Sequence, residues 1–274
     1  NDIQEALHLT SKLAEFEEGK LLVRHVDSDE LYKKPKFKKE ITEYLDEEKS
    51  YVISDELATN LLDEFKIPHP NQIVVSNLEE CITFASTSFP VALKATSEDL
   101  AHKTDFKAIH LDIRTISELE DRYAELKENI TKTTGNQAPK ILVQQMCTGN
   151  VEFFVGTNRE GGINIYEKDG LGFGHLLAIG QGGIYTEVYK DIRHILIPES
   201  REKIDSILSK TKVSQIIDGY RGKPKLAREK LLDLMMNLQK LLVSYPEIVS
   251  IDFNPVMITE EEAVVVDSKI YIGK

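Results

Sequence analysis

Segments typical of strands and of helices alternate along the chain from residue 54 onward, and this alternation constrains the fold more than any single motif. Ser54 is suited to cap a helix whose leucines recur at helical spacing up to Phe65, shortly before Pro68. Short apolar segments and amphipathic segments then follow one another. We expect strands over residues 72–75, 91–94, 109–113, 140–145, 152–156, 163–166, 175–179, 249–252, 255–258 and 263–266, and helices over residues 54–65, 77–86, 117–130, 199–210 and 226–243. This mixture predicts an α+β protein of two lobes.

The first 50 residues differ from the rest of the chain in their pattern of charged and apolar residues. Apolar residues between Asp2 and Phe16 form a helical stripe, and charge dominates from residue 20 to residue 50, apart from one amphipathic turn around Ile41. The lysine run at 33–39 fits a solvated linker better than a docking patch, and both interpretations remain open. We therefore divide the chain into a helix with a charged linker, a first lobe and a second lobe, over residues 1–50, 51–138 and 139–274.

Composition excludes several classes of protein. The chain of 274 residues is long enough for one large core or two modest ones, and no apolar run approaches the length of a membrane span. With no secretory signal pattern, this predicts a cytoplasmic protein that does not bind membranes. Cys81 and Cys147, the only cysteines, form neither a disulfide framework nor a zinc motif. A net charge of -12 argues against a nucleic-acid-binding surface, so an anionic ligand would have to be held locally.

A basic segment follows the expected strand at 91–94. Lys94 ends this strand, and Lys103 and Lys107 add positive charge around His102. Such lysines are suited to bind nucleotide phosphate, and a neutral imidazole among them can act as a nucleophile toward a phosphoryl group. The alternative is a surface loop with an incidental histidine.

Two glycine-containing segments are suited to hold anions. Gly182 and Gly183, after the strand at 175–179, can bring the backbone close to phosphate or adopt positive φ, although a tight hairpin turn would also use them. Arg221 lies between two glycines and can hold a phosphate or carboxylate. A turn between helices with a solvated arginine is the other interpretation of that segment.

Oxygen ligands lie near the ends of the last expected strands. Asp252 and Asn254 alternate, so we expect both side chains on one face, and pairing within a hairpin would bring Asp267 beside them. Carboxylate and amide oxygens suit Mg²⁺, which proteins often hold with one or two groups plus substrate phosphates. An ordinary turn around the Asn254-Pro255 pair is the alternative.

The strand at 140–145 ends in a segment that can border a nucleotide base. Gln144, Gln145 and Met146 can form a hinge whose backbone edge contacts adenine while the methionine packs on the ring. Glu152, on the following strand, can bind ribose hydroxyls or a metal ion. A plain strand end and an exposed glutamate explain the same residues equally well.

These motifs occur in an order that resembles a known family. From about residue 50 to residue 273, the chain is similar to the ATP-grasp subunit of ADP-forming acetyl-CoA synthetase, one of the NDP-forming acyl-CoA ligases related to succinyl-CoA synthetase. The resemblance rests on the following segments in this order: Lys94, residues 102–105, residues 144–146, Glu152, residues 173–184 with Glu187 and Asp191, residues 219–224, residues 252–255 and Asp267.

The resemblance implies an ATP-grasp fold, ATP or ADP with Mg²⁺ as cofactors, and the conversion of acyl-CoA, phosphate and ADP into acid, CoA and ATP. His102 would be a relay phosphohistidine that passes the phosphoryl group between ADP and a histidine of the CoA-binding part. The other site residues that the resemblance implies are Lys94 for nucleotide phosphate, residues 144–146 for adenine, Asn254 with Asp267 for magnesium, and Glu187 and Arg221 around the phosphates.

The resemblance also implies a CoA-binding ligase domain or subunit as the partner, with assembly into an oligomer in the full protein. Residues 3–16 resemble the last helix of a preceding ligase domain in single-chain relatives, so we expect the chain to be a piece of a longer protein. Two other functions stay open: an ATP-sensing regulatory module without turnover, and an ATP-grasp ligase that joins a carboxylate to an amine.

Overall fold

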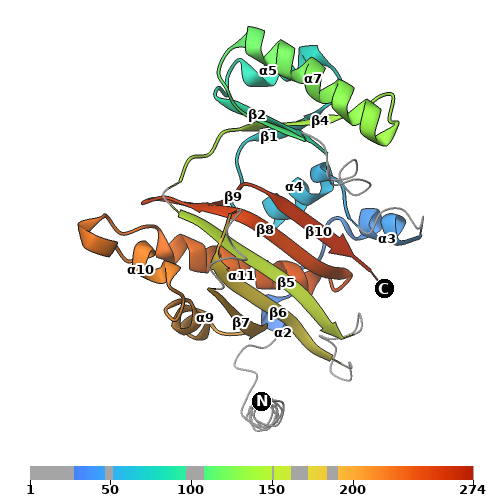
Figure 1. Ribbon diagram of the computed structural model, residues 1–274. Helices are drawn as coiled ribbons and strands as arrows, with labels where there is room; N and C mark the ends of the chain where they lie inside the picture. The colour runs from blue at the N-terminus through green and yellow to red at the C-terminus, as the bar shows by residue number, and fades with distance from the viewer. Residues whose placement is uncertain are drawn as a thin grey trace, which may run out of the picture.

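The computed structural model describes residues 28–46, 52–96, 108–149, 151–161, 172–183 and 191–273. Two antiparallel sheets organise these residues into an upper and a lower lobe (Figure 1). This arrangement confirms the predicted α+β class. Within the described part of the chain, no helix has both the length and the apolar character that crossing a membrane requires.

The first sheet has the strand order β1-β4-β2-β3. Helices α5 and α7 cover one of its faces (Figure 1) and pack there against Leu93 and Val143. The register pairs Ala92 with Gln144 and Lys94 with Leu142, so these alternate residues lie on the opposite face. The elements of this lobe are β1 (Gln72–Val75), α5 (Leu78–Ala85), β2 (Val91–Ala95), β3 (Ile109–Ile113), α7 (Ile116–Thr134) and β4 (Ile141–Gln145).

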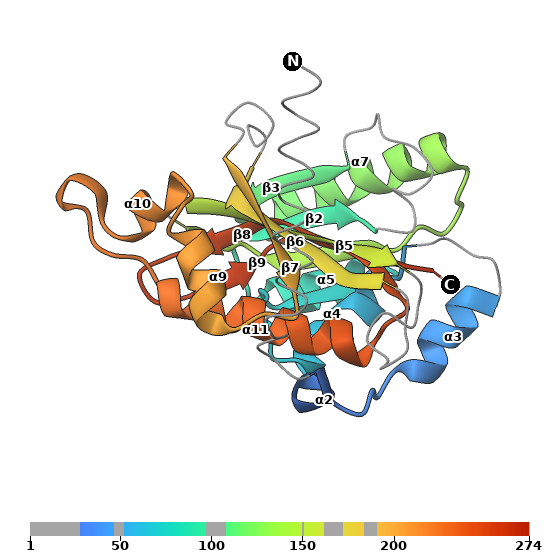
Figure 2. The ribbon, with the colours of Figure 1, turned by 90° about the horizontal axis from the view of Figure 1, so that it is seen from below.

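The second sheet has the order β10-β8-β5-β6-β7, and β9 pairs with the far end of β8. Its apolar face packs against α4, α9, α10 and α11 in one core, and Figure 2 shows α9 and α11 on the same side of the sheet. The strands are β5 (Val151–Gly161), β6 (Gly172–Gln181), β7 (Ile192–Ile197), β8 (Ile248–Ile258), β9 (Ala263–Val265) and β10 (Ser268–Ile272). The helices are α4 (Asp55–Glu64), α9 (Arg201–Leu208), α10 (Val213–Ile217), the 3-10 turn η1 (Tyr220–Gly222) and α11 (Arg228–Ser244).

One expectation about this sheet was wrong. Residues 249–252 and 255–258 form the single strand β8, not two strands. Phe253 lies opposite Val155 and Val256 lies opposite Phe153, so two residues of β8 face one residue of β5. This is a β-bulge, and a bulge can accommodate a proline that lacks a backbone donor. The strands β7 and β10 and the helix α10 were not predicted, and the expected strand at 163–166 lies outside the described residues.

Two elements cross the predicted division of the chain. Strand β4 was assigned to the second lobe, yet it pairs with β1 and β2 in the first sheet. Helix α4 was assigned to the first lobe, yet its leucines belong to the core of the second. The change from one sheet to the other therefore occurs between β4 and β5, and the domain limits themselves remain a proposal.

The lysine run at 33–39 contacts the folded body and is not only a solvated linker. Between α2 (Ser28–Leu31) and α3 (Lys38–Asp46), the backbone N–H of Phe37 donates to Tyr245 Oη at 2.9 Å. Lys38 pairs with the buried Glu247. Ile41, the centre of the predicted amphipathic turn, is fully buried in the second-lobe core. Residues 28–46 therefore add to that core.

A buried histidine gives the fold a measurable pH dependence. His175 on β6 is 0% exposed, and its Nε2 lies 2.9 Å from the backbone oxygen of Ile248. Burial lowers its pKa from 6.5 to about 4, against the effect of that hydrogen bond. The unfolded chain takes up this proton first, so stability is lost as pH falls from 6.5 toward 4, by up to roughly 3 kcal/mol.

We expect the His175→Gln variant to lose less stability than the wild type over this pH range. Glutamine keeps an N–H donor for Ile248 but does not titrate, so the histidine contribution disappears while the carboxyl groups titrate as before. Urea unfolding at pH 7 and pH 4.5 measures the difference. Equal losses in both proteins would show that His175 does not carry this pH dependence.

Candidate functional site

Lys94 reaches from the first sheet to the second lobe. Its Nζ donates to the backbone oxygen of Val266, between β9 and β10, at 3.1 Å, and the side chain is 8% exposed. Burial lowers the pKa of Lys94, and the negative charges of Asp267 and then Asp55 oppose this. The predicted phosphate-binding lysine is thus a desolvated cation next to the predicted metal ligand Asp267.

Gln144 meets the same carbonyl oxygen from the neighbouring strand. Its Nε2 donates to the Val266 oxygen at 3.0 Å and to Gln72 Oε1 at 2.6 Å. The side chain is almost fully buried. The carbonyl group of Val266 is therefore the point where two predicted nucleotide-binding residues of the first sheet contact the second lobe.

The three predicted metal ligands lie at the adjacent bulge. The backbone N–H of Asn254 donates to the Asp267 carbonyl at 3.3 Å, and that of Val266 donates to Pro255 at 3.0 Å. Asp252 and Asn254 point away from the core that holds Phe253. The structure thus confirms that β8 and the segment after β9 bring these residues together.

Asp252 carries an enclosed oxygen that accepts no hydrogen bond from the described residues. Burial raises the pKa of this carboxyl group, Lys269 on β10 opposes that rise, and Asp267 adds to it. No group of three or more His, Cys, Asp and Glu side chains in the described ranges is arranged to hold a metal. Two carboxylates and the Asn254 amide still fit Mg²⁺, which takes its remaining ligands from water and phosphate.

The predicted glycine turn lies against Glu152 and Asn254. The backbone N–H of Gly182 donates to the Glu152 carbonyl, and that of Gly183 donates to Asn254 Oδ1, both at 2.9 Å. A Cβ on Gly182 would come within 2.6 Å of the Phe153 backbone, and Gly183 has a φ of +84°. Close packing and positive φ therefore explain both glycines, and phosphate binding by this turn stays a prediction.

The predicted adenine hinge is held within the first lobe. The backbone N–H of Gln145 donates to Asn71 at 2.9 Å, and that of Met146 donates to Pro90 at 2.8 Å. Gln145 Oε1 also accepts a hydrogen bond from Asn71 Nδ2 at 3.2 Å. Contact of this hinge with a base stays a prediction.

Three predicted site residues lie outside the described residues: His102, Lys103 and Glu187. The base of the histidine segment is described, because the backbone N–H of Ala95 donates to the Ala108 carbonyl at 2.8 Å. Ala95, at the end of β2, and Ala108, the first described residue after residues 97–107, therefore lie side by side.

Arg221 is not brought to this site by the described contacts. It has a φ of +51°, and its guanidinium lies 5.3 Å from the ring centre of Tyr220. The arginine is exposed and makes no hydrogen bond or ion pair with the described site residues. Its predicted role around the phosphates stays untested.

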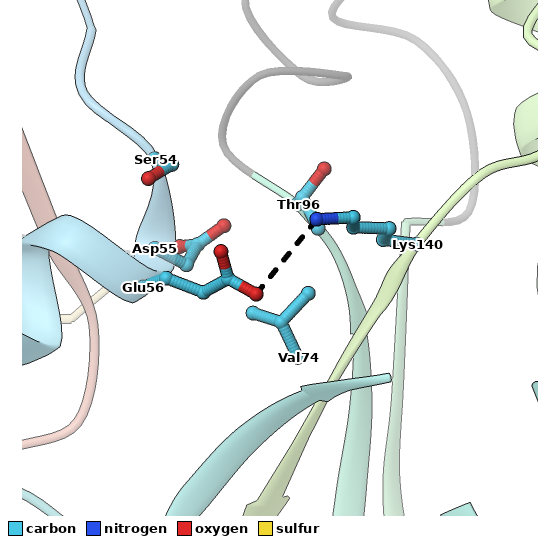
Figure 3. Close-up of a pocket in the computed structure, with 6 residues that line it drawn as sticks. All are labelled: Ser54, Asp55, Glu56, Val74, Thr96 and Lys140. Carbon is cyan, nitrogen blue, oxygen red and sulfur yellow. Dashed lines mark ion pairs between the residues drawn. The ribbon is translucent and has the colours of Figure 1, made fainter. Parts of the chain in front are cut away.

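A shallow pocket between the start of α4 and the first sheet contains residues that the sequence did not indicate as site residues (Figure 3). Thr96 follows Lys94 by two residues, just after the end of β2, and Lys140 reaches across the pocket to Glu56 at 3.8 Å. The space of about 190 Å³ is too small for a nucleotide. The period of two along β2 could have indicated Thr96. The lining residues are Ser54, Asp55, Glu56, Val74, Thr96 and Lys140.

Comparison with known proteins shows what the chain is similar to. A family model described as an ATP-grasp domain matches residues 44–272. Acetate–CoA ligase [ADP-forming] I of Archaeoglobus fulgidus is 30% identical over 207 residues, which cover 73% of this chain and 28% of the relative. The 4-hydroxybutyrate–CoA ligase [ADP-forming] of Nitrosopumilus maritimus is 26% identical, with 81% and 31% covered. The chain thus spans less than a third of the length of these two relatives.

Other relatives are of similar size to this chain. The beta subunit of acetate–CoA ligase [ADP-forming] II from Pyrococcus furiosus is 27% identical, with 78% of this chain and 89% of the subunit covered. The dinucleotide forming acetyl-coenzyme A synthetase 1 of Ca. Korarchaeum cryptofilum, in complex with coenzyme A, Ca-AMPCP and HgCl+, has a TM-score of 0.71 at 26% identity. That match covers 81% of this chain and 93% of the other. A further structure of that enzyme holds Mg-AMPPCP, with its phosphohistidine segment pointing towards the nucleotide binding site (TM-score 0.66, 26% identity, same coverage).

Proposed function

The chain belongs to the ATP-grasp domain family, and from this premise we propose that it is the nucleotide-binding, phosphoryl-transferring part of an ADP-forming acyl-CoA synthetase. The complete enzyme would interconvert acyl-CoA, phosphate and ADP with acid, CoA and ATP. The relatives named as ADP-forming ligases support this assignment.

One observation carries the proposal: a buried cation from the first sheet meets oxygen ligands of the second lobe. Lys94 contacts the Val266 carbonyl, and Asp267 is the next residue along the chain. Asn254 lies beside Asp267 through a backbone hydrogen bond. An ammonium group and oxygen ligands for a divalent cation are the groups that hold a nucleoside triphosphate and its metal ion.

In this proposal, His102 is the phosphoryl acceptor. Its ring nitrogen attacks the terminal phosphorus of ATP, the bond from that phosphorus to the bridging oxygen breaks, and ADP leaves with the electron pair while the ring proton passes to solvent. Lys94 and Lys103 offset the phosphate charge, and Mg²⁺ bound by Asp252, Asn254 and Asp267 would supply further positive charge. The remaining assignments are adenine contact by Gln144, Gln145 and Met146, ribose or metal contact by Glu152, phosphate contact by Gly182 and Gly183, and assistance by Glu187 and Arg221.

The second half of the reaction requires a partner. We assign CoA and acyl binding to a separate ligase domain or subunit, with assembly into an oligomer and without nucleic acid or membrane. The longer single-chain relatives and the beta subunit of P. furiosus support this division. A cytoplasmic location belongs to the same proposal, and the unpaired Cys81 and Cys147 support it because reducing compartments keep thiols free.

Incubation with γ-labelled ATP and Mg²⁺ tests the function. We expect an acid-labile, base-stable phosphoprotein, because a phosphorus–nitrogen bond hydrolyses in acid. Bound nucleotide without transfer would contradict the enzyme and favour the ATP-sensing module. Acyl hydroxamate formed from a carboxylic acid, ATP and hydroxylamine, without label on the protein, would favour a carboxylate–amine ligase.

A further inference from the structure

A chain of side-chain hydrogen bonds joins helix α4 to Gln144. Thr59 Oγ1 donates to the Asp55 carbonyl at 2.8 Å and accepts from Gln72 Nε2 at 2.7 Å. Gln72 Oε1 accepts from Gln144 Nε2 at 2.6 Å, and the same Nε2 donates to the Val266 carbonyl at 3.0 Å. Helix α4, which is anchored in the second-lobe core, thus contacts the predicted base-binding residue through β1.

The two backbone carbonyl groups at the ends of this series of hydrogen bonds fix the direction of every hydrogen bond in the series. A backbone carbonyl can only accept, so the Thr59 hydroxyl gives its single proton to Asp55 and must accept from Gln72. Gln72 therefore turns its NH₂ group toward Thr59 and its oxygen toward Gln144. Gln144 must then donate, and the Val266 carbonyl requires the same orientation from the other side. The alternative amide orientation would place two donors or two acceptors in contact.

This orientation leaves Gln144 with one unused group, its carbonyl oxygen Oε1. Both N–H groups of the amide are taken, and within the described ranges Oε1 accepts no hydrogen bond and is not among the enclosed unpartnered atoms. The neighbouring backbone donors of Gln145 and Met146 are also taken, by Asn71 and Pro90. At this position the hinge therefore offers an acceptor and not a donor.

We propose that Thr59 and Gln72 are positioning residues that hold the Gln144 amide with Oε1 toward the nucleotide base, and so make the site select a 6-amino purine over a 6-oxo purine. The inference rests on the proposed function, which puts the base at this hinge. The 6-amino group of adenine donates to an acceptor, whereas the 6-oxygen of guanine is an acceptor itself and would be left unpaired. A site built to pair with one polar group rejects the analogue that lacks it.

Equilibrium dialysis of the full chain with Mg-ATP and Mg-GTP tests this. We expect the wild type to bind ATP about tenfold to a hundredfold more tightly than GTP. The variants Thr59→Val and Gln72→Met should lower this ratio about threefold to tenfold, since only the Val266 carbonyl then holds the Gln144 amide in this orientation. Thr59→Ser keeps the hydroxyl group and should keep the ratio. Thr83→Val is the matched control, because Thr83 makes the same hydroxyl bond to Glu79 on α5 without any glutamine partner.

The ratio separates positioning from simple damage to the fold, which would weaken both nucleotides alike. A wild-type ratio near one, or a ratio that Thr59→Val and Gln72→Met leave unchanged, overturns the inference while nucleotide binding itself remains. A ratio that falls equally in Thr83→Val also overturns it. Failure of the wild type to bind either nucleotide would instead overturn the proposed function.

Discussion

The His102→Ala protein is expected to take up no phosphate from ATP and Mg²⁺, while it still binds nucleotide. Removing a covalent nucleophile typically costs about a thousandfold or more in rate, because the proposed acceptor of the phosphoryl group is then missing. Lys94, Gln144 and Asp267 belong to the described framework and do not depend on His102 for their contacts. Labelling with γ-labelled ATP measures the transfer, and equilibrium dialysis measures the binding.

A second histidine serves as the control for this experiment. His194 is exposed on β7, and replacing it with alanine should leave labelling unchanged. Mass spectrometry of the labelled wild type should locate the phosphate in the peptide that contains His102. An acid-labile phosphate on the His102→Ala protein would show that the acceptor is another residue and would end the relay hypothesis.

Local signals explain why most elements could be predicted from the sequence. Ser54 and Asn77 accept hydrogen bonds from the first turns of α4 and α5, as expected of N-cap residues. Gly135 ends α7 with a left-handed conformation, and it follows the helix predicted over residues 117–130 by a few residues. Each of these signals lies within a few residues of its effect.

Features that depend on distant residues were missed. Two strands were predicted where β8 is continuous, because pairing with β5 accommodates Pro255 in a bulge. Strand β7 contains the polar pair Arg193 and His194, which hides its apolar alternation. Whether such a segment forms a strand depends on the strand that it pairs with, and the local sequence does not identify that partner.

The same distinction holds for the site. Lys94, Asn254 and Asp267 were indicated as candidates by residue type and order, and the structure places all three where the first sheet contacts the second lobe. Gln72 and Thr59 could not be predicted, since the bond from Gln144 to Gln72 joins residues 72 positions apart and arises from the register of β1 on β4. Sequence reasoning thus finds the groups suited to contact a ligand more readily than the groups that orient them.

The Lys94→Met protein is expected to transfer phosphate about a hundredfold to a thousandfold more slowly than the wild type, without losing stability. The loss follows because no other described cation makes the contact between the sheets that Lys94 makes with Val266, and removing one preorganised donor typically has this effect. Labelling rates and thermal unfolding measure the two quantities. Lys132→Met, on the exposed surface of α7, should change neither of them.

Stability should persist because the buried ammonium of Lys94 is costly to the fold. It makes no ion pair with the described residues, and burial already lowers its pKa, so its desolvation is offset only by one carbonyl group and by the more distant charges of Asp267 and Asp55. Methionine has a similar length and removes that cost. A melting temperature that stays or rises while transfer falls identifies a residue retained for function and not for folding. If the loss of activity instead followed a loss of folded protein, Lys94 would be a structural lysine, and the phosphate-binding role proposed for it would be wrong.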